Sequence, residues 1–527
     1  MNPIRTGLAG SALLLTIAGL TVSLTSCGDE PVPLPEYPEG TARGVVFEDV
    51  NGNGIRDEGE AGIPGVGVSD QRMVTVTDRD GRWSLPAHRK GVYFVSKPRG
   101  YMTPVSEDNI PRFYYLHNEG EPLDLEGPVI PTTGPLPASI DFPLRRRAEP
   151  DRFQAIFMGD PQPRDQMEVD FLAHDVLEEL IGTTAAFAVT LGDITFDRPD
   201  LYASVTLATG VLGIPFYNTH GNHDANYDGR DTYDHFETWR TVFGPRYYSF
   251  DYGPVHFVIL SDVLFPDGGT SYIPGLGQEQ LEWLEADLSH VPVDRLVVLA
   301  MHIPLRPAET VPDFARLYEL LRDRPHTLSL SAHSHDLTQA FLPEDWGWSG
   351  VAPHYHINAG ATCGSWWEGA RDETDIPHAT SSDGSPNGYF IVSFDGNQHT
   401  ARFKAARRPA DHQMQIQAPD SVAQRDLADT PVLVNVFSAS PGSTVEMRVG
   451  DSGEWVGMDF APQPDPLFVR VAERESGRRA SVSFHIWEGR LPAGLTPGGH
   501  LIRVRTTDRY GQEFVGSRII RVVNDLP

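Results

Sequence analysis

Cysteine is scarce in this chain, and acidic side chains greatly outnumber basic ones. The 527 residues include two cysteines, and 72 aspartates and glutamates stand against 42 lysines and arginines. The thiol of Cys27 is expected to carry a lipid, which leaves Cys363 as the other cysteine, so no disulfide is expected within the mature chain. The formal charge of −30 repels polyanions, so a nucleic-acid duplex is not an expected partner. Such a surface is compatible with divalent cations, although charge alone identifies no site.

The first 27 residues have the features of an export signal. Arg5 supplies a positive charge, residues 8–24 are uncharged and mostly apolar, and Cys27 follows small residues. The apolar run is short for a membrane span, and the pattern resembles the lipobox of bacterial lipoproteins, whose cysteine is acylated after cleavage. We therefore expect a signal peptide over residues 1–27, lipidation at Cys27 and a Pro-rich, acidic linker over 28–40. An ordinary signal peptide with a coincidental cysteine is the alternative.

Length and composition predict a multidomain, β-rich globular protein. A chain of this length is expected to form about three domains. Strand-like runs separated by Gly, Pro, Asn and Asp predict an N-terminal β-sandwich over residues 41–148. Strand-like runs alternate with helical periodicity over 149–408, notably at 166–181 and 278–288, which predicts an α/β domain with amphipathic covering helices. Residues 409–527 return to β-like patterning and predict a C-terminal β-sandwich.

A calcium-loop pattern lies within the N-terminal region. Oxygen-bearing side chains occupy positions 1, 3, 5, 9 and 12 of a twelve-residue stretch, and glycine occupies position 6. The expected ligands are Asp49, Asn51, Asn53, Ile55, Asp57 and Glu60. Because the flanking sequence is strand-like rather than helical, the segment resembles the calcium-stapled B-type repeats of bacterial surface adhesins more than an EF-hand. A turn that binds no ion is the alternative.

Five apolar runs of the middle region are each followed at once by residues able to bind metal. These residues are Asp160, Gln162, Asp193, Asn222, His223, Asp224, His302, His333 and His335. At the carboxyl ends of strands they would converge on one edge of a sheet. Carboxylate, amide and imidazole donors suit a pair of transition metal ions such as Mn, Fe, Zn or Ni. Two ions about 3.5–4 Å apart activate water as hydroxide and clamp a phosphoryl group, so the pattern predicts phosphoester hydrolysis.

Taken together, these residues resemble the calcineurin-like metallophosphoesterases over about residues 150–405. The resemblance implies a central β-sandwich flanked by helices and a site for two ions. Metal one would be held by Asp160, Gln162, Asp193 and His335, and metal two by Asp193, Asn222, His302 and His333. It also implies that His223 acts as general acid or phosphate donor and that Asp224 orients it.

Three positions depart from the family pattern. Gln162 stands where most members have histidine, which is expected to weaken metal one or favour a harder ion such as Mn or Mg. Ser331 replaces a glycine, a mild change if the backbone needs no positive φ there. Phe196 occupies the position of the tyrosine ligand of purple acid phosphatases, so the chain is not expected to be one of them.

The flanking regions resemble those of a bacterial envelope branch of the same family. Within that branch, the loops carrying Trp366, Trp367, Asn387 and Tyr389 are expected near the metal edge as walls of the substrate site. The alternative for the two tryptophans is packing between domains. His354 and His356 share one face of an expected strand and are interpreted as ordinary strand residues.

The sequence therefore predicts a two-metal phosphoester hydrolase, for mono- or diesters, anchored by lipid at the bacterial cell envelope. Small or membrane-borne phosphoesters are the expected substrates. Two alternatives stay open: a surface binding protein that keeps a metal site without turnover, and an enzyme that cleaves an amide or another ester with the same metals. A nucleophilic role for Cys363 is not favoured, because nothing supplies a dedicated base.

Overall fold

The computed structural model describes residues 40–525 except 267, 441, 452 and 476–478. The predicted export signal, the lipidation site at Cys27 and residues 28–39 of the linker lie outside the described residues. Within the described part, no helix combines the length and the apolar character needed to cross a membrane.

Residues 41–146 form two four-stranded sheets. The first has the order β4 (Arg82–Pro86), β1 (Thr41–Glu48), β8 (Phe142–Arg146) and β6 (Tyr101–Met102), and the second has the order β3 (Val74–Val76), β2 (Gly67–Ser69), β5 (Lys90–Val95) and β7 (Tyr114–Asn118). Trp83 packs against Tyr93 and Phe142 in the core. The expectation of an N-terminal β-rich domain is confirmed, and the likeness to adhesin repeats stays a prediction.

Two larger sheets pack face to face in the middle of the chain. The first has the order β11 (Phe216–Thr219), β10 (Phe187–Leu191), β9 (Arg152–Met158), β20 (Gly388–Asp395) and β21 (Gln398–Ala405); the second has the order β12 (Tyr248–Tyr252), β13 (Val255–Ile259), β16 (Leu296–Ala300), β17 (Thr327–Ser331), β19 (Tyr355–Ala359) and β18 (Leu337–Phe341). Phe187 of β10 meets Phe250 of β12 and Phe257 of β13, which joins the sheets through an aromatic core.

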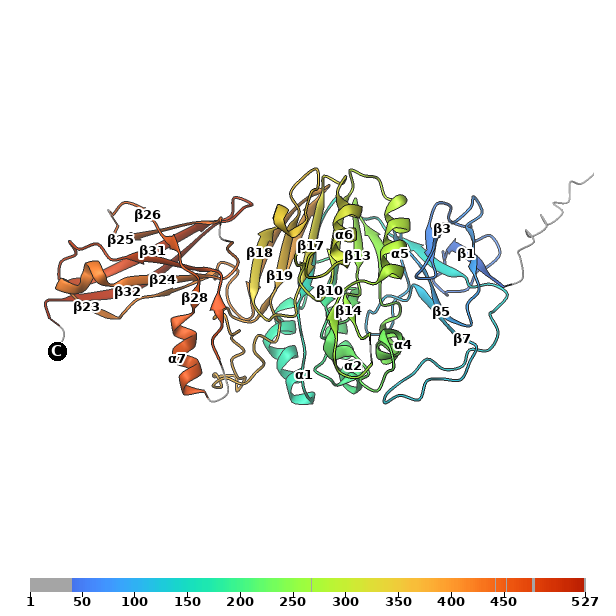
Figure 1. Cartoon of the computed structure of the whole chain (residues 1–527), viewed down its shortest axis with the longest axis horizontal. Coiled ribbons are helices and arrows are strands. Elements are labelled where there is room, and N and C mark those ends of the chain that lie inside the picture. The colour runs from blue at the N-terminus through green and yellow to red at the C-terminus, as the bar shows by residue number, and fades with distance from the viewer. Residues whose placement is uncertain (1–39, 267, 441, 452, 476–478, 526–527) are drawn as a thin grey trace, which may run out of the picture. The chain divides into compact units, whose positions relative to one another are not determined.

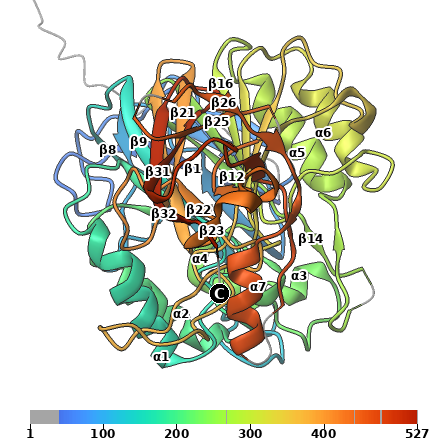
Figure 2. The same cartoon turned by 90° about the vertical axis from the view of Figure 1, so that its left-hand side faces the viewer.

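Helices cover these sheets. α1 (Gln166–Leu172) continues as a π-helical turn (Ala173–Leu177) and a 3₁₀ turn (Glu178–Leu180), so the predicted helix is present but changes its hydrogen bonding along its length. It lies beside α2 (Tyr202–Gly210), while α5 (Gln278–Ser289), the second predicted helix, lies beside α6 (Asp313–Leu321) (Figures 1 and 2). The short helices α3 (Thr232–His235) and α4 (Glu237–Phe243) lie in the segment that joins β11 to β12.

Residues 414–523 form another pair of sheets. One has the order β22 (Met414–Gln417), β24 (Pro431–Val436), β30 (Ile486–Arg490) and β27 (Asp459–Phe460), and the other has the order β23 (Ser421–Ala423), β32 (Glu513–Val523), β31 (Gly498–Thr507), β25 (Thr444–Val449) and β26 (Val456–Gly457). Val434, Trp487 and Ile502 are buried between them. Helix α7 (Pro466–Arg474) lies in the chain between β28 (Gln463–Pro464) and β29 (Val482–Ser483), and these two strands pair as a small antiparallel sheet. In the middle region, β14 (Val263–Leu264) and β15 (Ile273–Pro274) form another two-stranded sheet. The expected C-terminal β-rich domain is confirmed.

Candidate metal centre

All seven predicted metal ligands lie just beyond the carboxyl ends of five buried strands. β9 leads to Asp160 and Gln162, β10 to Asp193, β11 to Asn222, β16 to His302, and β17 to His333 and His335. Strands β9, β10 and β11 are mutually parallel in one sheet, and β16 and β17 are parallel in the other. The ligand-bearing turns of the two sheets therefore meet at one edge of the sandwich.

Most of these ligands are held in left-handed backbone conformations. Among the described residues, eleven other than glycine have positive φ, and five of the eleven are predicted ligands: Asp160 (38°), Gln162 (42°), Asp193 (51°), His333 (70°) and His335 (55°). Each such residue costs about 1 kcal/mol or more, so it persists only where the surroundings hold it. Backbone contacts between turns do so: Gln162 N donates to Asp193 O at 3.1 Å, and His333 N to Asp160 Oδ2 at 2.9 Å.

Glycines before two ligands leave room for side chains from other turns. A Cβ on Gly192 would lie 2.4 Å from Nδ1 of His302, and a Cβ on Gly221 would lie 2.1 Å from Oδ1 of Asp193. No larger residue fits without moving a ligand.

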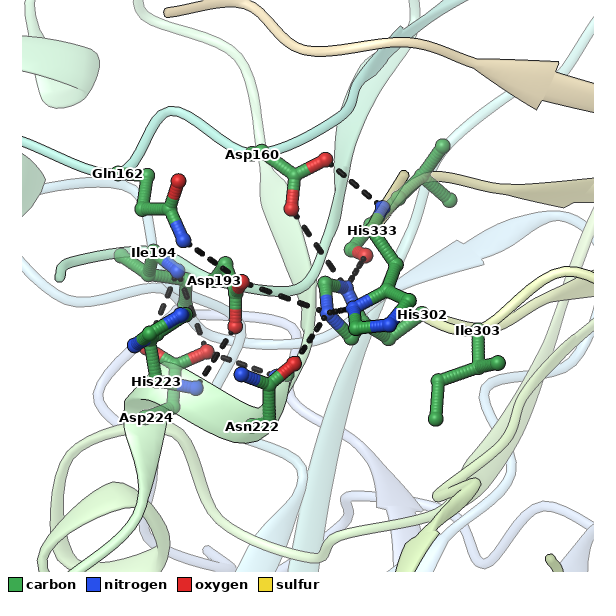
Figure 3. Close-up of polar contacts among 12 residues, drawn as sticks. Asp160, Gln162, Asp193, Ile194, Asn222, His223, Asp224, His302, Ile303 and His333 are labelled. Atoms are coloured by element: carbon green, nitrogen blue, oxygen red, sulfur yellow. Dashed lines mark hydrogen bonds and ion pairs between the residues drawn. The ribbon is translucent and has the colours of Figure 1, made fainter. Parts of the chain in front are cut away.

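The metal-two set comprises Asp193, Asn222, His302 and His333, and the ligating atoms of the other three lie close to Nε2 of His302. Nδ1 of His302 donates to Leu191 O at 2.8 Å, which leaves Nε2 as the ligating nitrogen. That Nε2 lies 3.1 Å from His333 Nδ1, 3.2 Å from Asn222 Oδ1 and 3.4 Å from Asp193 Oδ2 (Figure 3). Ligands about 2.1 Å from a shared ion are separated by about 3.0–3.4 Å, so this donor set fits a single transition metal ion.

The metal-one set, comprising Asp160, Gln162, Asp193 and His335, is arranged less tightly. Nε2 of Gln162 donates to Asp193 Oδ2 at 2.8 Å, so the amide nitrogen rather than its oxygen faces the shared carboxylate. Oδ1 of Asp160 is buried and accepts no hydrogen bond from any described residue. Nδ1 of His335 forms a hydrogen bond of 2.6 Å with the backbone oxygen of Gly364. Among the described Asp, Glu, His and Cys residues, one group of three has ligating atoms within 4.8 Å of one another. It consists of Asp193, His302 and His333.

Charge in the site favours cations. Burial by itself lowers the pKa of His302, but the carboxylates of Asp193 and Asp160 raise it to about 10. Burial and the positive charge of His302 lower the pKa of His333 to about 3, and burial raises the pKa of Asp160 well above its usual range. The carboxyl groups of Asp160 and Asp193 are buried together in this site, an arrangement that suits divalent ions.

His223 is paired with Asp197 instead of Asp224. Nδ1 of His223 donates to Oδ1 of Asp197 at 2.7 Å. The buried carboxylate of Asp224 instead accepts Gly221 N at 2.8 Å and Ile194 N at 3.0 Å. The prediction that Asp224 orients His223 is therefore wrong, because the tight 3₁₀ turn over Asn222–Asp224 directs the two side chains to different partners. Asp224 fixes the backbone that carries Asp193 and Asn222.

The surroundings of His223 favour its protonated form. Burial lowers the pKa of this imidazole, but the hydrogen bond to Asp197 and the charges of Asp193 and Asp197 raise it above its ordinary value. Because Nδ1 is committed to Asp197, Nε2 is the nitrogen that can exchange a proton with a bound substrate.

Comparison with protein-family models gives three matches. The N-terminal domain of calcineurin-like phosphoesterase matches residues 50–124, the calcineurin-like phosphoesterase domain matches 156–337, and its C-terminal domain matches 356–514. The chain belongs to the calcineurin-like phosphoesterase family. It is therefore a metal-dependent phosphoric ester hydrolase, and the family implies a dinuclear divalent metal centre.

Solved structures that are similar to this phosphoesterase share little sequence with it. A structure of PhoD is 12% identical with a TM-score of 0.36, over 77% of this chain and 92% of that one. The purple acid phosphatase PPD1 from yellow lupin seeds is 13% identical with a TM-score of 0.34, over 69% and 67% of the two chains. A search of curated proteins gave no match.

Sequence reasoning missed three residues beside the phosphoesterase site. Asp197 has a left-handed backbone like the ligands, and Tyr227 donates to Asp197 Oδ1 at 2.8 Å. Asp262 accepts the backbone N–H groups of His302 and Ile303, and burial raises its pKa to about 7. The spacing of Asp197, four residues after Asp193, was the one available signal. Asp262 follows β13, a parallel strand of the second sheet that is not one of the five apolar runs.

Three of the four proposed substrate-wall residues are turned away from the metal edge. Trp367 Nε1 and Asn387 Nδ2 both donate to Asp175 Oδ2 at 2.8 Å, and Tyr389 donates to Glu179 Oε1 at 2.9 Å. The wall prediction is wrong for these buried residues, because their polar atoms bind the helical segment after α1. Trp366 is different: its ring lies 5.0 Å from His335 and 5.4 Å from Phe196, and its φ is 56°. It stays a candidate.

The other family departures have local explanations. Ser331 is absent from the described residues with positive φ, and its Oγ contacts His356 Nε2 at 3.0 Å, so serine is tolerated there. Phe196 stacks on His223 at 4.2 Å. Cys363 is buried with Sγ 3.9 Å from Gln162 Oε1, and burial raises the pKa of its thiol, which makes it a poor nucleophile.

The calcium-loop segment folds on itself. Asp49 accepts hydrogen bonds from Gly52 N and Gly54 N, and the side-chain amides of Asn51 and Asn53 both donate to Asp57. Glu60 accepts from the N–H groups of Val50 and Asp57, which closes the loop, and Ile55 is exposed. The predicted ligands thus share one loop, and calcium binding stays a prediction.

Proposed function

We propose that this phosphoesterase uses two divalent transition metal ions to hydrolyse small or membrane-borne phosphomonoesters or phosphodiesters at the bacterial cell envelope. The observation that carries the proposal is the convergence of three donor atoms on Nε2 of His302, next to the His223–Asp197 pair. The first arrangement suits a metal ion and the second suits proton transfer, and phosphoester hydrolysis needs both.

The ions, when bound, supply Lewis acidity and a water of lowered pKa. The chain's own residues bind and orient. Asp193 belongs to both ligand sets, and Leu191 O fixes the tautomer of His302. His223 donates the proton on Nε2 to the departing oxygen of the substrate and keeps the proton on Nδ1, which stays hydrogen-bonded to Asp197. Tyr227 holds Asp197 in place, so the imidazole keeps its orientation as its charge changes.

The proposed function is tested by comparing an aryl phosphate monoester, a diester and a diphosphate side by side. Protein stripped with a chelator is reloaded with Mn, Fe, Zn, Ni or Mg, and product release is followed. We expect hydrolysis of at least one ester only after reloading, and its loss in His223→Ala. No product release from any of the three substrates with any ion would contradict the proposal and favour the alternative of a surface protein that keeps a metal site without turnover, for which the inward-facing Gln162 amide is the supporting observation.

The envelope location rests on sequence features outside the described residues. An apolar run followed by Cys27 supports a lipid anchor, and the acidic, Pro-rich stretch after it supports a tether. Expression of the full chain in a bacterial host with labelled fatty acid should place the label on the protein and the protein in the membrane fraction. Cys27→Ala should lose both, and retention of the label would contradict the proposal.

We also propose structural calcium binding by the loop over residues 49–60. The full spacing of oxygen-bearing residues supports it. Calcium titration of the protein by calorimetry should show one site that disappears in Asp49→Ala, and titration curves that do not differ between the two proteins would contradict it.

A further inference from the structure

Strand β18 begins two residues after His335 and so limits how far the metal-binding turn can move. The turn over residues 332–336 carries His333 and His335, both in left-handed conformations. Leu337, the first residue of β18, donates its backbone N–H to Oδ2 of Asp383 at 2.9 Å. Whatever holds Asp383 therefore also holds one end of this turn.

Asp383 is buried at the tip of a turn that inserts between β18 and the C-terminal sheets. Its Oδ1 accepts the N–H and hydroxyl of Ser385 within the turn. Its Oδ2 accepts a hydrogen bond from Nε2 of His485 at 3.0 Å and another from the backbone N–H of Leu337. Of the groups bound to this carboxylate, His485 is the one supplied by the C-terminal domain, 102 positions further along the chain.

The C-terminal domain fixes His485 from its other side. Nδ1 of His485 lies 2.6 Å from Oδ1 of Asn435 in β24. The amide group of Asn435 donates to Asp383 O and to Oδ2 of Asp465, which sets which of its atoms faces the imidazole. Asp465 also caps α7 by accepting Phe468 N. Nδ1 of His485 also lies 3.1 Å from Oγ of Ser483, so both ring nitrogens have polar partners and the ring is held in one orientation.

The fit between the inserted turn and the C-terminal domain is close. Gly384 has φ of 83°, and a Cβ there would lie 2.4 Å from Cβ of Asp465. His485 and Asn435 are fully buried, and Asp383 and Asp465 are 1% exposed. Solvent therefore does not compete for these hydrogen bonds, and losing one leaves a buried polar group unpaired.

We propose that His485 is a positioning residue of the metal centre: through Asp383 and Leu337 N it holds the turn that presents His333 and His335. The C-terminal domain thus helps to fix the positions of two metal ligands. This inference rests on the proposed function for the roles of the two histidines. Its geometric part, the immobilisation of the turn, does not depend on that function.

A second contact between the same elements provides a matched control. Gln339 in β18 donates its Nε2 to the backbone oxygen and to Oγ of Ser438 in the C-terminal domain. It joins the same strand to the same domain but lies further from the metal turn. Ser438→Ala therefore removes an interdomain hydrogen bond without touching the link to Leu337.

The test compares the whole chain with His485→Ala, His485→Gln and Ser438→Ala. Cobalt binding is followed by its visible absorption, and hydrogen exchange is measured on peptides covering residues 331–341. In His485→Ala we expect about tenfold weaker cobalt binding, a changed absorption band, faster exchange at the turn and a lower kcat with little change in KM. The amide of His485→Gln can still donate to Asp383, so it should restore most of the affinity. Ser438→Ala should match the unaltered protein.

Faster exchange confined to the C-terminal sheets, with the turn and the cobalt spectrum unchanged, would overturn the inference and leave His485 a purely structural residue. If His485→Ala does not fold, His485→Leu fills more of the buried space but offers no donor to Asp383, and it should give the same local changes. An unaltered protein that binds no cobalt would overturn the proposed function and the metal role of His485 with it, whereas normal binding in every variant would overturn only the inference.

Discussion

The two halves of the metal centre, the metal-one and metal-two ligand sets, share Asp193 but differ in how closely their ligating atoms approach one another. In the metal-two set, His302 Nε2 has three donor atoms within 3.4 Å. In the metal-one set, the same Asp193 oxygen that faces His302 accepts a hydrogen bond from Gln162. A metal-two ion would take the place of a proton on His302, whereas a metal-one ion would need the Gln162 amide to turn its oxygen toward the site. We infer that the halves bind metal with unequal strength.

Removing the shared ligand should erase the difference between the halves. Asp193→Ala takes a carboxylate from both sets, so we expect hydrolysis to fall by about a thousandfold or more, since charge stabilisation in a transition state alone is worth about 10²–10³. Steady-state kinetics and metal content after dialysis measure the two effects. Asp200→Ala is the matched control, because that aspartate is exposed and pairs with the surface residue Arg198. Tight retention of two ions in Asp193→Ala would contradict its bridging position.

The proton-transfer pair should be separable from both halves. Asp197→Asn removes the charge that supports protonated His223 while preserving the shape of the side chain. We expect kcat to fall about a hundredfold, at the low end of the usual contribution of acid–base catalysis, with metal content unchanged. A loss of bound metal in this variant would instead make Asp197 part of the metal site.

Replacing the amide should make the halves more alike. Gln162→His supplies a nitrogen donor and removes the hydrogen bond to Asp193. We expect the weaker ion to bind about tenfold more tightly or better, seen as a rise in zinc retained per chain after dialysis. Gln162→Ala, which lacks a donor, should leave one ion bound. Equal retention in all three proteins would show that the halves do not differ in the way inferred.

The smallest effect is expected from Trp366, which lies beside the metal-one ligand His335. Trp366 lies beside His335 and Phe196, and the guanidinium of Arg164 lies 5.6 Å from its ring. Trp366→Ala should raise KM for an aryl phosphate by about three- to tenfold, the range given by about 1 kcal/mol of aromatic contact, with little change in kcat. Trp367→Ala should instead lower the melting temperature, because it removes a buried ring and its bond to Asp175. The opposite pattern would reverse the assignment of the two tryptophans.

The ligands were predictable from the sequence because each follows an apolar run, and parallel strands bring such positions to one edge. Residues whose role depends on side-chain direction were not. Asp224 is next to His223 in the chain but binds the backbone, whereas Asp197 reaches the imidazole from a different turn. Trp366 and Trp367 are adjacent and face different partners. The link from His485 to Leu337 spans two domains and leaves no local pattern at all.

The glycines beside the ligands make the metal centre hard to transfer piece by piece. The space above Gly221 is occupied by Asp193, and the space above Gly192 by His302. Each of these two turns thus carries its own ligand and leaves room for a ligand from another turn. A single turn grafted into an unrelated scaffold would bring donor atoms without the room or the backbone restraint they need. The two turns and the histidine they enclose must therefore be transferred together, although they come from segments distant in sequence.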